Sequence, residues 1–448
     1  MNETPRPAAG LPRLTVIGTG YLGATHAICM AVLGYDVLGV DVDERKIARL
    51  ASGEVPFFEP GLPELLAKAL ESGRLRFTTS FAEAGEFGDV HFLCVGTPQQ
   101  PGSDAADLTY VDAAVRSLAP HLNRRTLVVG KSTVPVGTAT RLTGVLQELA
   151  PAGTDAELAW NPEFLREGFA VDDTMRPDRL VFGVASAWAE EQLYAAFQPI
   201  LDLGTPVVRT DLATAELVKV AANSFLATKI SYINAMAEVC EAVGADIKDL
   251  ADSLALDDRI GGKFLKPGLG FGGGCLPKDI RAFAHRAEEL GVGQAVAFLR
   301  EVDDINRRRR ARTVDLVREL LGGKISGARI ACWGAAFKPN SDDIRDAPAL
   351  DVARTMHGLG GRVRVYDPAA LDNARRAFPE LRYGESALDV AEDADVVVLL
   401  TEWADFREVA PDALAMVVKH KRIVDGRHAL DATQWREAGW EYRALGRA

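Results

Sequence analysis

The stretch LTVIGTGYLG, residues Leu14–Gly23, begins as a short apolar run and continues into closely spaced glycines. The run Leu14–Ile17 has the length and composition of a buried strand. The glycines that follow it in the spacing GxGxxG are Gly18, Gly20 and Gly23. This spacing gives a tight turn and leaves the N-terminus of a helix beginning at Tyr21 and Leu22 open to a pyrophosphate. The strand, the turn and the helix together predict an α/β unit that binds a dinucleotide.

An acidic residue follows these glycines at the distance that a dinucleotide site requires. The apolar run Val37–Val40 ends in Asp41, and a carboxylate about 20 residues after the glycines binds the ribose 2′-hydroxyl. Because Asp41 would repel the 2′-phosphate of NADP, we expect NAD as the cofactor. Arg45 and Lys46 carry the opposite charge and leave that preference open, with Lys46 as a further candidate contact of the cofactor.

Polar residues follow the next apolar runs. Val90–Val95 leads to Thr97, and Leu127–Val129 leads to Thr133. Because ligands of open parallel sheets lie beyond the carboxyl ends of the strands, we expect these threonines to line the cofactor and its substrate.

The segment NPEFLREG follows another short strand that ends at Trp160. Its glutamates, Glu163 and Glu167, are four residues apart and would share one face of a helix. The alternative is a capped helix start that is exposed to solvent and has no chemical role.

A long helix is predicted from Leu212 to Val243, since this stretch lacks proline and glycine and is followed by Gly244. Roughly 32 residues at 1.5 Å each span about 48 Å, enough to join two domains. Lys219 and Asn223 share one face of this helix among apolar neighbours. Their ammonium and amide groups would stabilise a developing alkoxide. The alternative is that Lys219 only extends its charge to solvent.

The stretch DDRIGGKFLKPGLGFGGGCLPKDIR, residues 257–281, combines a glycine-rich loop with one cysteine. Cys275 precedes a helix that the pattern predicts to begin near Pro277. A thiol at a helix N-terminus with Lys278 nearby is in a position that lowers a cysteine pKa. Asp279 would serve as a general base or orient a water. The alternative is a surface loop that contains a buried cysteine.

The last third repeats the alternation of strands and helices. The predicted strands are Arg329–Trp333, Val363–Tyr366, Asp395–Leu400 and Arg422–Val424. Gly334 after the first strand and Asp367 after the second echo the first third, but GxGxxG is absent. This pattern predicts a second parallel α/β unit with a different nucleotide, contacted by Lys338 and Arg345. A purely structural domain is the alternative.

Composition narrows the function classes. The chain has 448 residues and a net charge of −12, which argues against nucleic acid as the main partner. We expect the one basic run, Arg307–Arg310, to be a solvated or subunit-facing surface.

The five cysteines are scattered and form no CxxC pair, so neither disulfides nor a metal site are expected. Cys29, Cys94, Cys240 and Cys332 lie among apolar residues and are expected in the core. The first dozen residues lack the apolar segment of a signal peptide, and no apolar run reaches membrane-spanning length. We therefore expect a cytoplasmic protein without a membrane partner.

The predicted fold is α/β, with two Rossmann-like parallel-sheet domains joined by a long central helix. The expected parts are a flexible tail over residues 1–12, an NAD-binding domain over 13–210, a central helical and dimerisation region with the cysteine loop over 211–310, and a nucleotide-sugar-binding domain over 311–448.

Nine motifs, in chain order, resemble the UDP-glucose 6-dehydrogenase family of nucleotide-sugar dehydrogenases. They are VIGTGYLG, CVGTP, KSTVPVGT, NPEFLREG, ELVKVAANSF, RIGGKFLKPGLGFGGGCLPKD, FKPNSDDIRDAP, VYDP and LLTEW. The resemblance implies a four-electron oxidation of a nucleotide-activated glucose (UDP-glucose or dTDP-glucose) at C6 to the glucuronate with two NAD molecules in turn. GDP-mannose or another sugar nucleotide is the alternative substrate. A thiohemiacetal and then a thioester would form on the cysteine, since hydride transfer from an aldehyde first needs a tetrahedral adduct.

The resemblance also assigns residues. Cys275 is implied as the nucleophile, Lys219 and Asn223 as oxyanion stabilisers, and Asp279, Glu163 and Thr133 as groups for proton and water transfer. Implied cofactor contacts are Gly18, Gly20, Tyr21, Leu22, Gly23, Asp41, Lys46, Thr97, Thr133, Glu167, Lys278 and Arg345. Implied substrate contacts are Glu163, Phe164, Leu165, Lys219, Asn223, Arg259, Phe264, Lys266, Gly268, Phe271, Gly272 and Lys338. Because Arg259 resembles an arginine that reaches a neighbouring subunit's substrate, a homodimer or higher homo-oligomer is implied.

Two positions depart from the glucose branch of the family. Leu276 stands where an aromatic residue is common, so that CLPKD looks more like GDP-mannose dehydrogenases, and Asp258 stands where proline is frequent. The base of the nucleotide therefore stays open between uracil, thymine and guanine. Two other functions compete: a two-electron hydroxyacid-type dehydrogenase, which needs no cysteine, and a nucleotide-sugar sensor that has lost catalysis.

Overall fold

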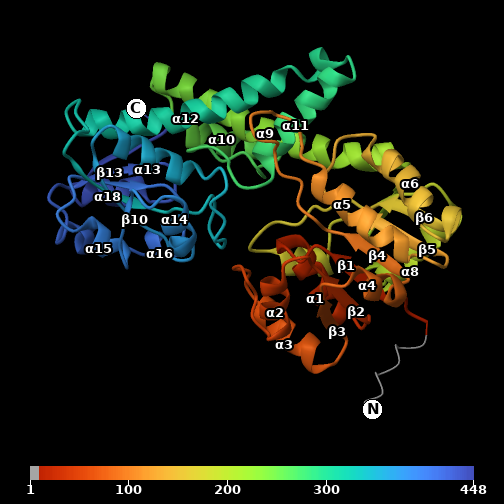
Figure 1. Ribbon diagram of the computed structural model, residues 1–448. Helices are drawn as coiled ribbons and strands as arrows, with labels where there is room; N and C mark the ends of the chain where they lie inside the picture. Colours follow the sequence, from red (N-terminus) through yellow and green to blue (C-terminus); the bar gives the residue numbers. More distant parts are fainter. Residues whose placement is uncertain (1–9, 448) are drawn as a thin grey trace. The chain divides into compact units, whose positions relative to one another are not determined.

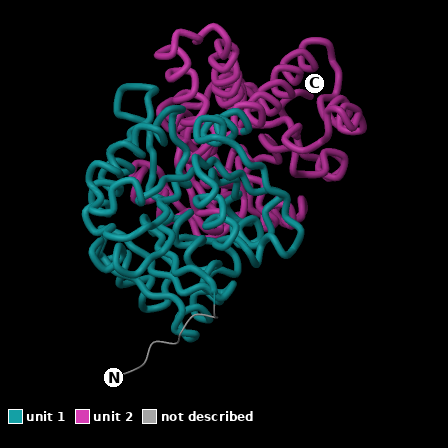
Figure 2. The backbone as a smooth tube through the Cα atoms, turned by 90° about the vertical axis from the view of Figure 1, so that its right-hand side faces the viewer, with its two compact units in different colours: residues 1–222 teal, residues 223–448 magenta. Residues whose placement is uncertain are grey.

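The computed structural model describes residues 10–447 (Figure 1). Residues 1–9 of the predicted tail lie outside the described residues. The chain divides into two compact units, Met1–Ala222 and Asn223–Ala448, with the division inside helix α9 (Leu212–Val243) (Figure 2).

The first unit contains an eight-stranded sheet in the order β3-β2-β1-β4-β5-β6-β7-β8. Its strands are β1 (Leu14–Ile17), β2 (Val37–Val40), β3 (Leu75–Thr78), β4 (Val90–Leu93), β5 (Thr126–Gly130), β6 (Ala156–Trp160), β7 (Leu180–Gly183) and β8 (Val207–Thr210). Neighbouring strands are parallel except β6 and β7, which meet in an antiparallel bridge between Trp160 and Gly183. The predicted parallel sheet is therefore confirmed with one antiparallel junction, and β1 and β2 have the predicted limits.

Helices separate these strands along the chain. They are α1 (Tyr21–Val32), α2 (Glu44–Ala51), α3 (Leu62–Glu71), α4 (Phe81–Phe87), α5 (Thr109–Leu118), α6 (Thr138–Leu149), α7 (Ala170–Met175) and α8 (Ala187–Leu201). Alternate side chains of a strand enter different apolar clusters, as Val16 and Ile17 do. Both faces of the sheet are thus covered, which explains why its strands read as continuous apolar runs.

The central segment is helical. Helix α9 has the limits predicted from the absence of proline and glycine, and Gly244 follows it with φ of +76°. The next helices are α10 (Ile247–Ala255), α11 (Leu276–Glu289) and α12 (Phe298–Leu320). The predicted helix after Cys275 is confirmed as α11.

A six-stranded sheet, in the order β11-β10-β9-β12-β13-β14, is parallel throughout and belongs to the second unit. Its strands are β9 (Arg329–Trp333), β10 (Arg362–Tyr366), β11 (Arg382–Tyr383), β12 (Val396–Leu399), β13 (Arg422–Asp425) and β14 (Glu441–Ala444). Its helices are α13 (Pro348–Gly358), α14 (Leu371–Ala377), α15 (Ala387–Ala391), α16 (Ala404–Arg407), α17 (Pro411–Ala415) and α18 (Ala432–Glu437). In Figure 1, α12 and α13 lie on one side of this sheet and α15 and α16 on the other. The second predicted α/β unit is confirmed.

The prediction of a solvated arginine run was wrong for two of its members. The side chains of Arg309 and Arg310 are 1% and 10% exposed. Arg309 donates to Glu241, and Arg310 donates to Asp346 and to the carbonyl oxygen of Phe271. The charge of the arginine run could not reveal that Arg309 and Arg310 find acidic partners in distant segments of the sequence.

Candidate active site

The glycine turn after β1 has the geometry of a pyrophosphate site. Gly18 has φ of +90°, and a Cβ there would lie 2.8 Å from the backbone nitrogen of Val95. A Cβ on Gly23 would lie 1.8 Å from the carbonyl oxygen of Gly18, so only glycine allows α1 to pack this closely. Helix α1 begins after Gly20 without a capping side chain and without an acidic residue in its first turn. Its N-terminus is therefore suited to an anion.

Asp41 lies at the end of β2 and is 8% exposed. One carboxylate oxygen accepts hydrogen bonds from the backbone nitrogen of Thr19 at 2.8 Å and from Nζ of Lys46 at 2.8 Å. Burial alone would raise the pKa of Asp41, but the bonds from Lys46, Asp43 and Thr19 lower it below its ordinary value. The carboxylate form is therefore favoured, and its oxygens also accept from Oγ1 of Thr19 and from the backbone nitrogen of Asp43.

The two predicted threonines come together. Oγ1 of Thr97, in the loop after β4, donates to the carbonyl oxygen of Thr133 at 2.7 Å. Ser132 binds the carbonyl oxygen of Val95 at 2.6 Å. These bonds join the loops after two neighbouring strands at the carboxyl end of the sheet.

The segment that carries Glu163 and Glu167 is a loop rather than a helix. The expectation that these glutamates share one helix face was therefore wrong, because α7 begins only at Ala170. Oε1 of Glu163 accepts from the backbone nitrogens of Phe164 and Leu165 at 2.5 and 2.6 Å. Side-chain acceptance of its own loop's N–H groups competes with helix formation here.

Two residues near this loop were not singled out as site residues by the sequence. Glu59, 3% exposed, accepts from the Tyr21 hydroxyl and from the backbone nitrogens of Gly168 and Ala170 at 2.6 and 2.8 Å. Burial and the bond to Glu59 raise the pKa of Tyr21. Lys131 lies 3.4 Å from Oε2 of Glu163. Lys131 opens the motif KSTVPVGT but was not assigned a role, and Glu59 lies outside the quoted motifs, so the fold alone reveals their partners.

Lys219 and Asn223 lie four positions apart on α9 and are both buried. Nζ of Lys219 lies 5.3 Å from the ring centroid of Phe164. Burial to 8% exposure excludes the alternative in which Lys219 extends into solvent. Nδ2 of Asn223 donates to Asp279 at 2.6 Å, and Nζ of Lys278 donates to the other oxygen of Asp279 at 2.6 Å.

Cys275 is the residue that precedes α11, and it is exposed. Lys278 and the buried Asp279 follow in the first turn of that helix. The other four cysteines are buried, as predicted. Burial raises the pKa of Cys29 and of Cys94 to about 12 in each case, which leaves Cys275 as the accessible thiol.

The glycine-rich loop before Cys275 is held along its length by hydrogen bonds and close packing with other segments of the second unit. The backbone nitrogen of Gly268 donates to Asn234 at 2.9 Å. Asn306 of α12 accepts from the nitrogen of Phe271 at 2.7 Å and donates to its carbonyl oxygen at 2.9 Å. A Cβ on Gly272 would lie 2.2 Å from the carbonyl oxygen of Asp346. This loop is held by its neighbours rather than free at the surface.

The remaining predicted contacts lie at the surface or at its edge. Phe264 and Lys266 are exposed, and Phe264 has φ of +62°. Arg259 is exposed and pairs with Asp257 at 2.6 Å. Arg345 pairs with Asp343 at 2.7 Å, and Nζ of Lys338 lies 5.3 Å from the ring centroid of Phe337. Leu22 is partly buried against the core of the first unit.

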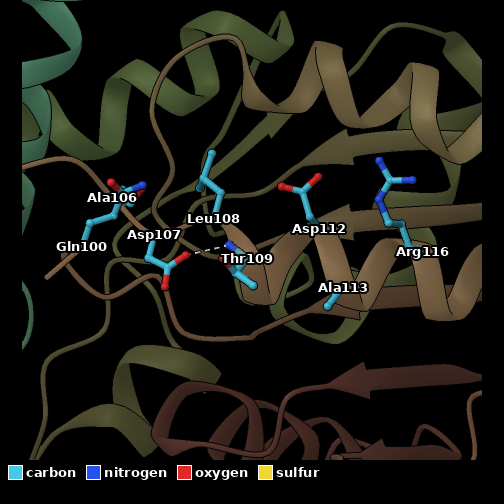
Figure 3. Close-up of a pocket in the computed structure, with 8 residues that line it drawn as sticks. All are labelled: Gln100, Ala106, Asp107, Leu108, Thr109, Asp112, Ala113 and Arg116. Carbon is cyan, nitrogen blue, oxygen red and sulfur yellow. Dashed lines mark hydrogen bonds between the residues drawn. The ribbon is translucent and has the colours of Figure 1, made fainter.

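A shallow groove of about 540 Å³ lies along α5 and the loop that precedes it (Figure 3). Its lining residues are Gln100, Ala106, Asp107, Leu108, Thr109, Asp112, Ala113 and Arg116. None of them is a predicted site residue. Over residues 10–447, no three His, Cys, Asp or Glu side chains form a group able to hold a metal ion. Within the same residues, no helix is both long and apolar enough to cross a membrane.

The structure thus brings predicted residues together in two groups. In the first unit, the glycine turn, Asp41 and Lys46 lie at the carboxyl end of the sheet, as do Thr97 and Thr133. In the second unit, Asn223, Lys278 and Asp279 form one hydrogen-bonded cluster beside the α11 N-terminus that Cys275 precedes. The first group suits a dinucleotide, and the second offers a thiol with polar neighbours.

Comparison with known proteins identifies the family. The chain matches the NAD binding domain of the UDP-glucose/GDP-mannose dehydrogenase family over residues 12–201, its central domain over 213–308 and its UDP binding domain over 331–432. It is 41% identical to a UDP-glucose 6-dehydrogenase of Rhizobium meliloti (97% of this chain, 99% of the relative) and 39% identical to UDP-glucose 6-dehydrogenase TuaD of Bacillus subtilis (98% and 94%). A solved UDP-glucose dehydrogenase from Pyrobaculum islandicum superposes with a TM-score of 0.90 at 37% identity, covering 99% of this chain and 100% of that one. The chain therefore belongs to the UDP-glucose/GDP-mannose dehydrogenase family and is an NAD-dependent oxidoreductase.

Proposed function

We propose that this protein oxidises UDP-glucose at C6 to UDP-glucuronate, with two NAD reduced per sugar. The single observation that carries the proposal is Cys275, the exposed thiol at the start of α11. The names of the relatives support UDP-glucose as the substrate. A two-electron alcohol dehydrogenase would not need this cysteine.

The chemistry needs each group in turn. The glycine turn after β1 and Asp41 would hold NAD, which when bound would supply the hydride acceptor for both oxidations at C6. The Cys275 thiolate adds to the aldehyde carbon between these steps, because an aldehyde must become tetrahedral before it can lose a hydride. Water then cleaves the thioester. The overall balance is one alcohol, one water and two NAD⁺ giving one carboxylate, two NADH and three protons.

Other residues have supporting roles in this proposal. Lys219 stabilises the oxyanion with its buried ammonium. Asn223 acts on the same charge and orients Asp279, to which it donates. Glu163 and Thr133 bind the water that releases the acid. Asp41 holds the ribose of NAD.

The second unit is proposed to hold the nucleotide sugar. Contacts would come from the loop over residues 264–272 and from Lys338. The ammonium of Lys338 lies 5.3 Å from the ring centroid of Phe337, and this ring would stack on the base. We further propose a cytoplasmic homodimer in which the exposed Arg259 reaches the partner's substrate.

The test is the NADH yield with each donor. Purified protein is mixed with excess NAD and a limiting amount of UDP-glucose, dTDP-glucose or GDP-mannose, and absorbance at 340 nm is followed to completion. Two NADH per UDP-glucose, with much lower rates for the other two, is the expected result. One NADH with free aldehyde would refute the four-electron reaction, and a preference for another donor would correct the base.

A further inference from the structure

Glu59 is a buried carboxyl group in the segment between α2 and α3 of the first unit. It is 3% exposed. Its oxygens accept hydrogen bonds from the hydroxyl of Tyr21 and from the backbone nitrogens of Gly168 and Ala170, at 2.6 and 2.8 Å for the two nitrogens. Burial of such a group is costly unless its oxygens meet donors. These donors come from two segments that are far apart in the sequence, so Glu59 holds the two segments together.

The first segment is the end of the loop that precedes α7. Ala170 is the first residue of α7, and the residue before it, Phe169, offers no side-chain cap. The first N–H groups of a helix need acceptors from outside the helix. Glu59 supplies one to Ala170 and binds Gly168 as well. Glu167, which is 9% exposed, directly precedes this anchored glycine. The anchor therefore fixes the end of the loop, which carries a predicted contact of the cofactor.

The second segment is the start of α1, whose first residue is Tyr21. The hydroxyl of Tyr21 donates to Glu59 and accepts from the backbone nitrogen of Gly168 at 3.0 Å. The ring of Tyr21 lies beside that of Phe57, with their centroids 4.8 Å apart. Burial, and then Glu59, raise the pKa of Tyr21, and the charge of Glu167 acts in the same direction. The phenol therefore keeps the proton that it donates to Glu59.

Tyr21 joins these hydrogen bonds to the pyrophosphate site. It follows Gly20 directly, and α1 has neither a capping side chain nor an acidic residue in its first turn. The N–H groups of this turn are therefore the donors that a pyrophosphate would meet. Because a hydrogen bond weakens steeply when its donor moves out of line, a shift of Tyr21 would weaken the binding of NAD.

We propose that Glu59 is a positioning residue for NAD. Through Tyr21 it fixes the first turn of α1, and through Gly168 and Ala170 it fixes the loop end that carries Glu167. It acts through these groups rather than through a contact with the cofactor. All of these residues belong to the first unit. This role goes beyond the proposed function, because it concerns NAD alone and does not depend on which sugar is oxidised.

The test is the Kd for NAD, measured by isothermal titration calorimetry on the full chain without sugar, at a temperature well below the Tm of every variant. Glu59→Gln replaces one carboxylate oxygen by an amide NH2 group, so at least one donor loses its acceptor. We expect the Kd for NAD to rise at least fivefold. Tyr21→Phe keeps the ring beside Phe57 and removes the hydroxyl, and here the Kd should rise at least threefold.

Tyr35→Phe is the matched control. Tyr35 is fully buried beyond the other end of α1, and its hydroxyl donates to the carbonyl oxygen of Ala195 at 2.8 Å. This variant therefore also removes a phenol hydrogen bond from the first unit. It should lower Tm, while the Kd for NAD stays within twofold of the wild type. If Glu59→Gln and Tyr21→Phe likewise lower Tm and leave the Kd within twofold, Glu59 is merely structural and the proposal is overturned.

A double variant tests whether the two residues act together. If Glu59 acts on NAD through Tyr21, the Kd of the Glu59→Gln/Tyr21→Phe protein should rise by less than the product of the two single changes. A rise equal to that product would overturn the connection. Tighter binding of NAD by Glu59→Gln would mean that the charge of Glu59 repels the pyrophosphate, and this too would overturn the proposal. If Glu59→Gln does not fold, the comparison of Tyr21→Phe with Tyr35→Phe decides alone.

The outcome stays separate from that of the proposed function. A wild type that binds NAD but forms no NADH from any sugar nucleotide would refute the proposed function, and the ratios of Kd would still decide the role of Glu59. A wild type that does not bind NAD would overturn the role of Glu59 as well.

Discussion

Native alkylation should modify one cysteine of the five. The perturbation is iodoacetamide added to the folded protein at pH 8. Cys275 is exposed, while Cys29, Cys94, Cys240 and Cys332 are 0–5% exposed. Because the thiolate is the reacting form, both access and ionisation enter the rate.

The size of the difference follows from ionisation alone. Burial raises the pKa of Cys29 and Cys94 to about 12, so roughly one molecule in 10⁴ carries the thiolate at pH 8. An exposed thiol with the ordinary pKa of about 8.5 is about one quarter ionised at that pH. The thiolate fraction of such an exposed thiol therefore exceeds that of Cys29 or Cys94 by about 10³, and lack of access slows the buried thiols further.

Intact mass spectrometry with peptide mapping measures the outcome. We expect one adduct per chain, on Cys275, and loss of NADH formation in step with labelling. Cys275→Ser should take up no label. Cys240→Ala, which removes a buried thiol, should still take up one, and protein unfolded in urea should take up five.

Two results would refute the reasoning. If a buried cysteine is labelled earlier in the reaction than Cys275, the side chains packed around that buried thiol must open readily. Labelled protein that keeps full turnover would remove Cys275 from the chemistry, and with it the four-electron reaction.

Three further predictions concern positions outside the thiol. Asn306→Ala removes two buried hydrogen bonds to the Phe271 backbone, and each group left unsatisfied costs about 1–3 kcal/mol. Thermal unfolding should therefore show a lower Tm. The KM for UDP-glucose should rise, while the KM for NAD stays within threefold of the wild type. Asp41→Ala should raise the KM for NAD at least tenfold and narrow the NAD/NADP preference in parallel assays, because the ribose loses its acceptor. Burial would raise the pKa of Glu241, but hydrogen bonds from Arg309 and Arg312 lower it. The carboxylate therefore stabilises the folded protein above about pH 4.3, and this contribution is lost as the pH falls through the lower folded pKa. The difference in Tm between wild type and Glu241→Gln should be largest near pH 7 and vanish in acid, whereas a constant difference would contradict this.

Elements with a strong local pattern were predictable. The limits of α9 followed from the absence of helix breakers, and β1 and β2 followed from apolar runs that ended in a glycine or an acid. Strands β7 (LVFG) and β11 (RY) were not predicted, and neither were three strands of mixed composition: β3 (LRFT), β8 (VVRT) and β14 (EYRA). Strands β3, β8 and β14 lie at edges of their sheets, where only one neighbour covers them, and their mixed polar composition gives no continuous apolar run.

Parts of the site that depend on long-range partners were not predictable. Glu59 and Glu163 are fixed by backbone groups and a lysine, and Arg309 is fixed by Glu241 across 68 positions of sequence. A motif identifies a residue type at a position, but it does not reveal which donor faces it. For this reason the helix expected around Glu163 was wrong although the motif itself was read correctly.

The acids that follow β2 and β10 show how equivalent positions in the sequence acquire different partners in the fold. Both Asp41 and Asp367 follow the second strand of a unit and look equivalent in sequence. Asp41 is 8% exposed and lies beside an uncapped helix that begins four residues after β1. The fully buried Asp367 accepts from the backbone nitrogens of Ala335, Ala336, Ala369 and Ala370 and from the indole of Trp403.

A carboxylate has about four lone-pair sites, and Asp367 meets five donors with no exposure. Asp41 meets four donors, from Thr19, Asp43 and the partly exposed Lys46, and keeps an exposure of 8%. Asp367 is therefore the more closed of the two to a ribose hydroxyl.

The segment over residues 334–347 also separates β9 from α13, whose first residue, Pro348, has no N–H to offer a phosphate. The second unit repeats the architecture of the first but cannot bind a dinucleotide in the same way. Lys338 and Arg345 lie in that segment, and their contacts with a nucleotide stay a prediction.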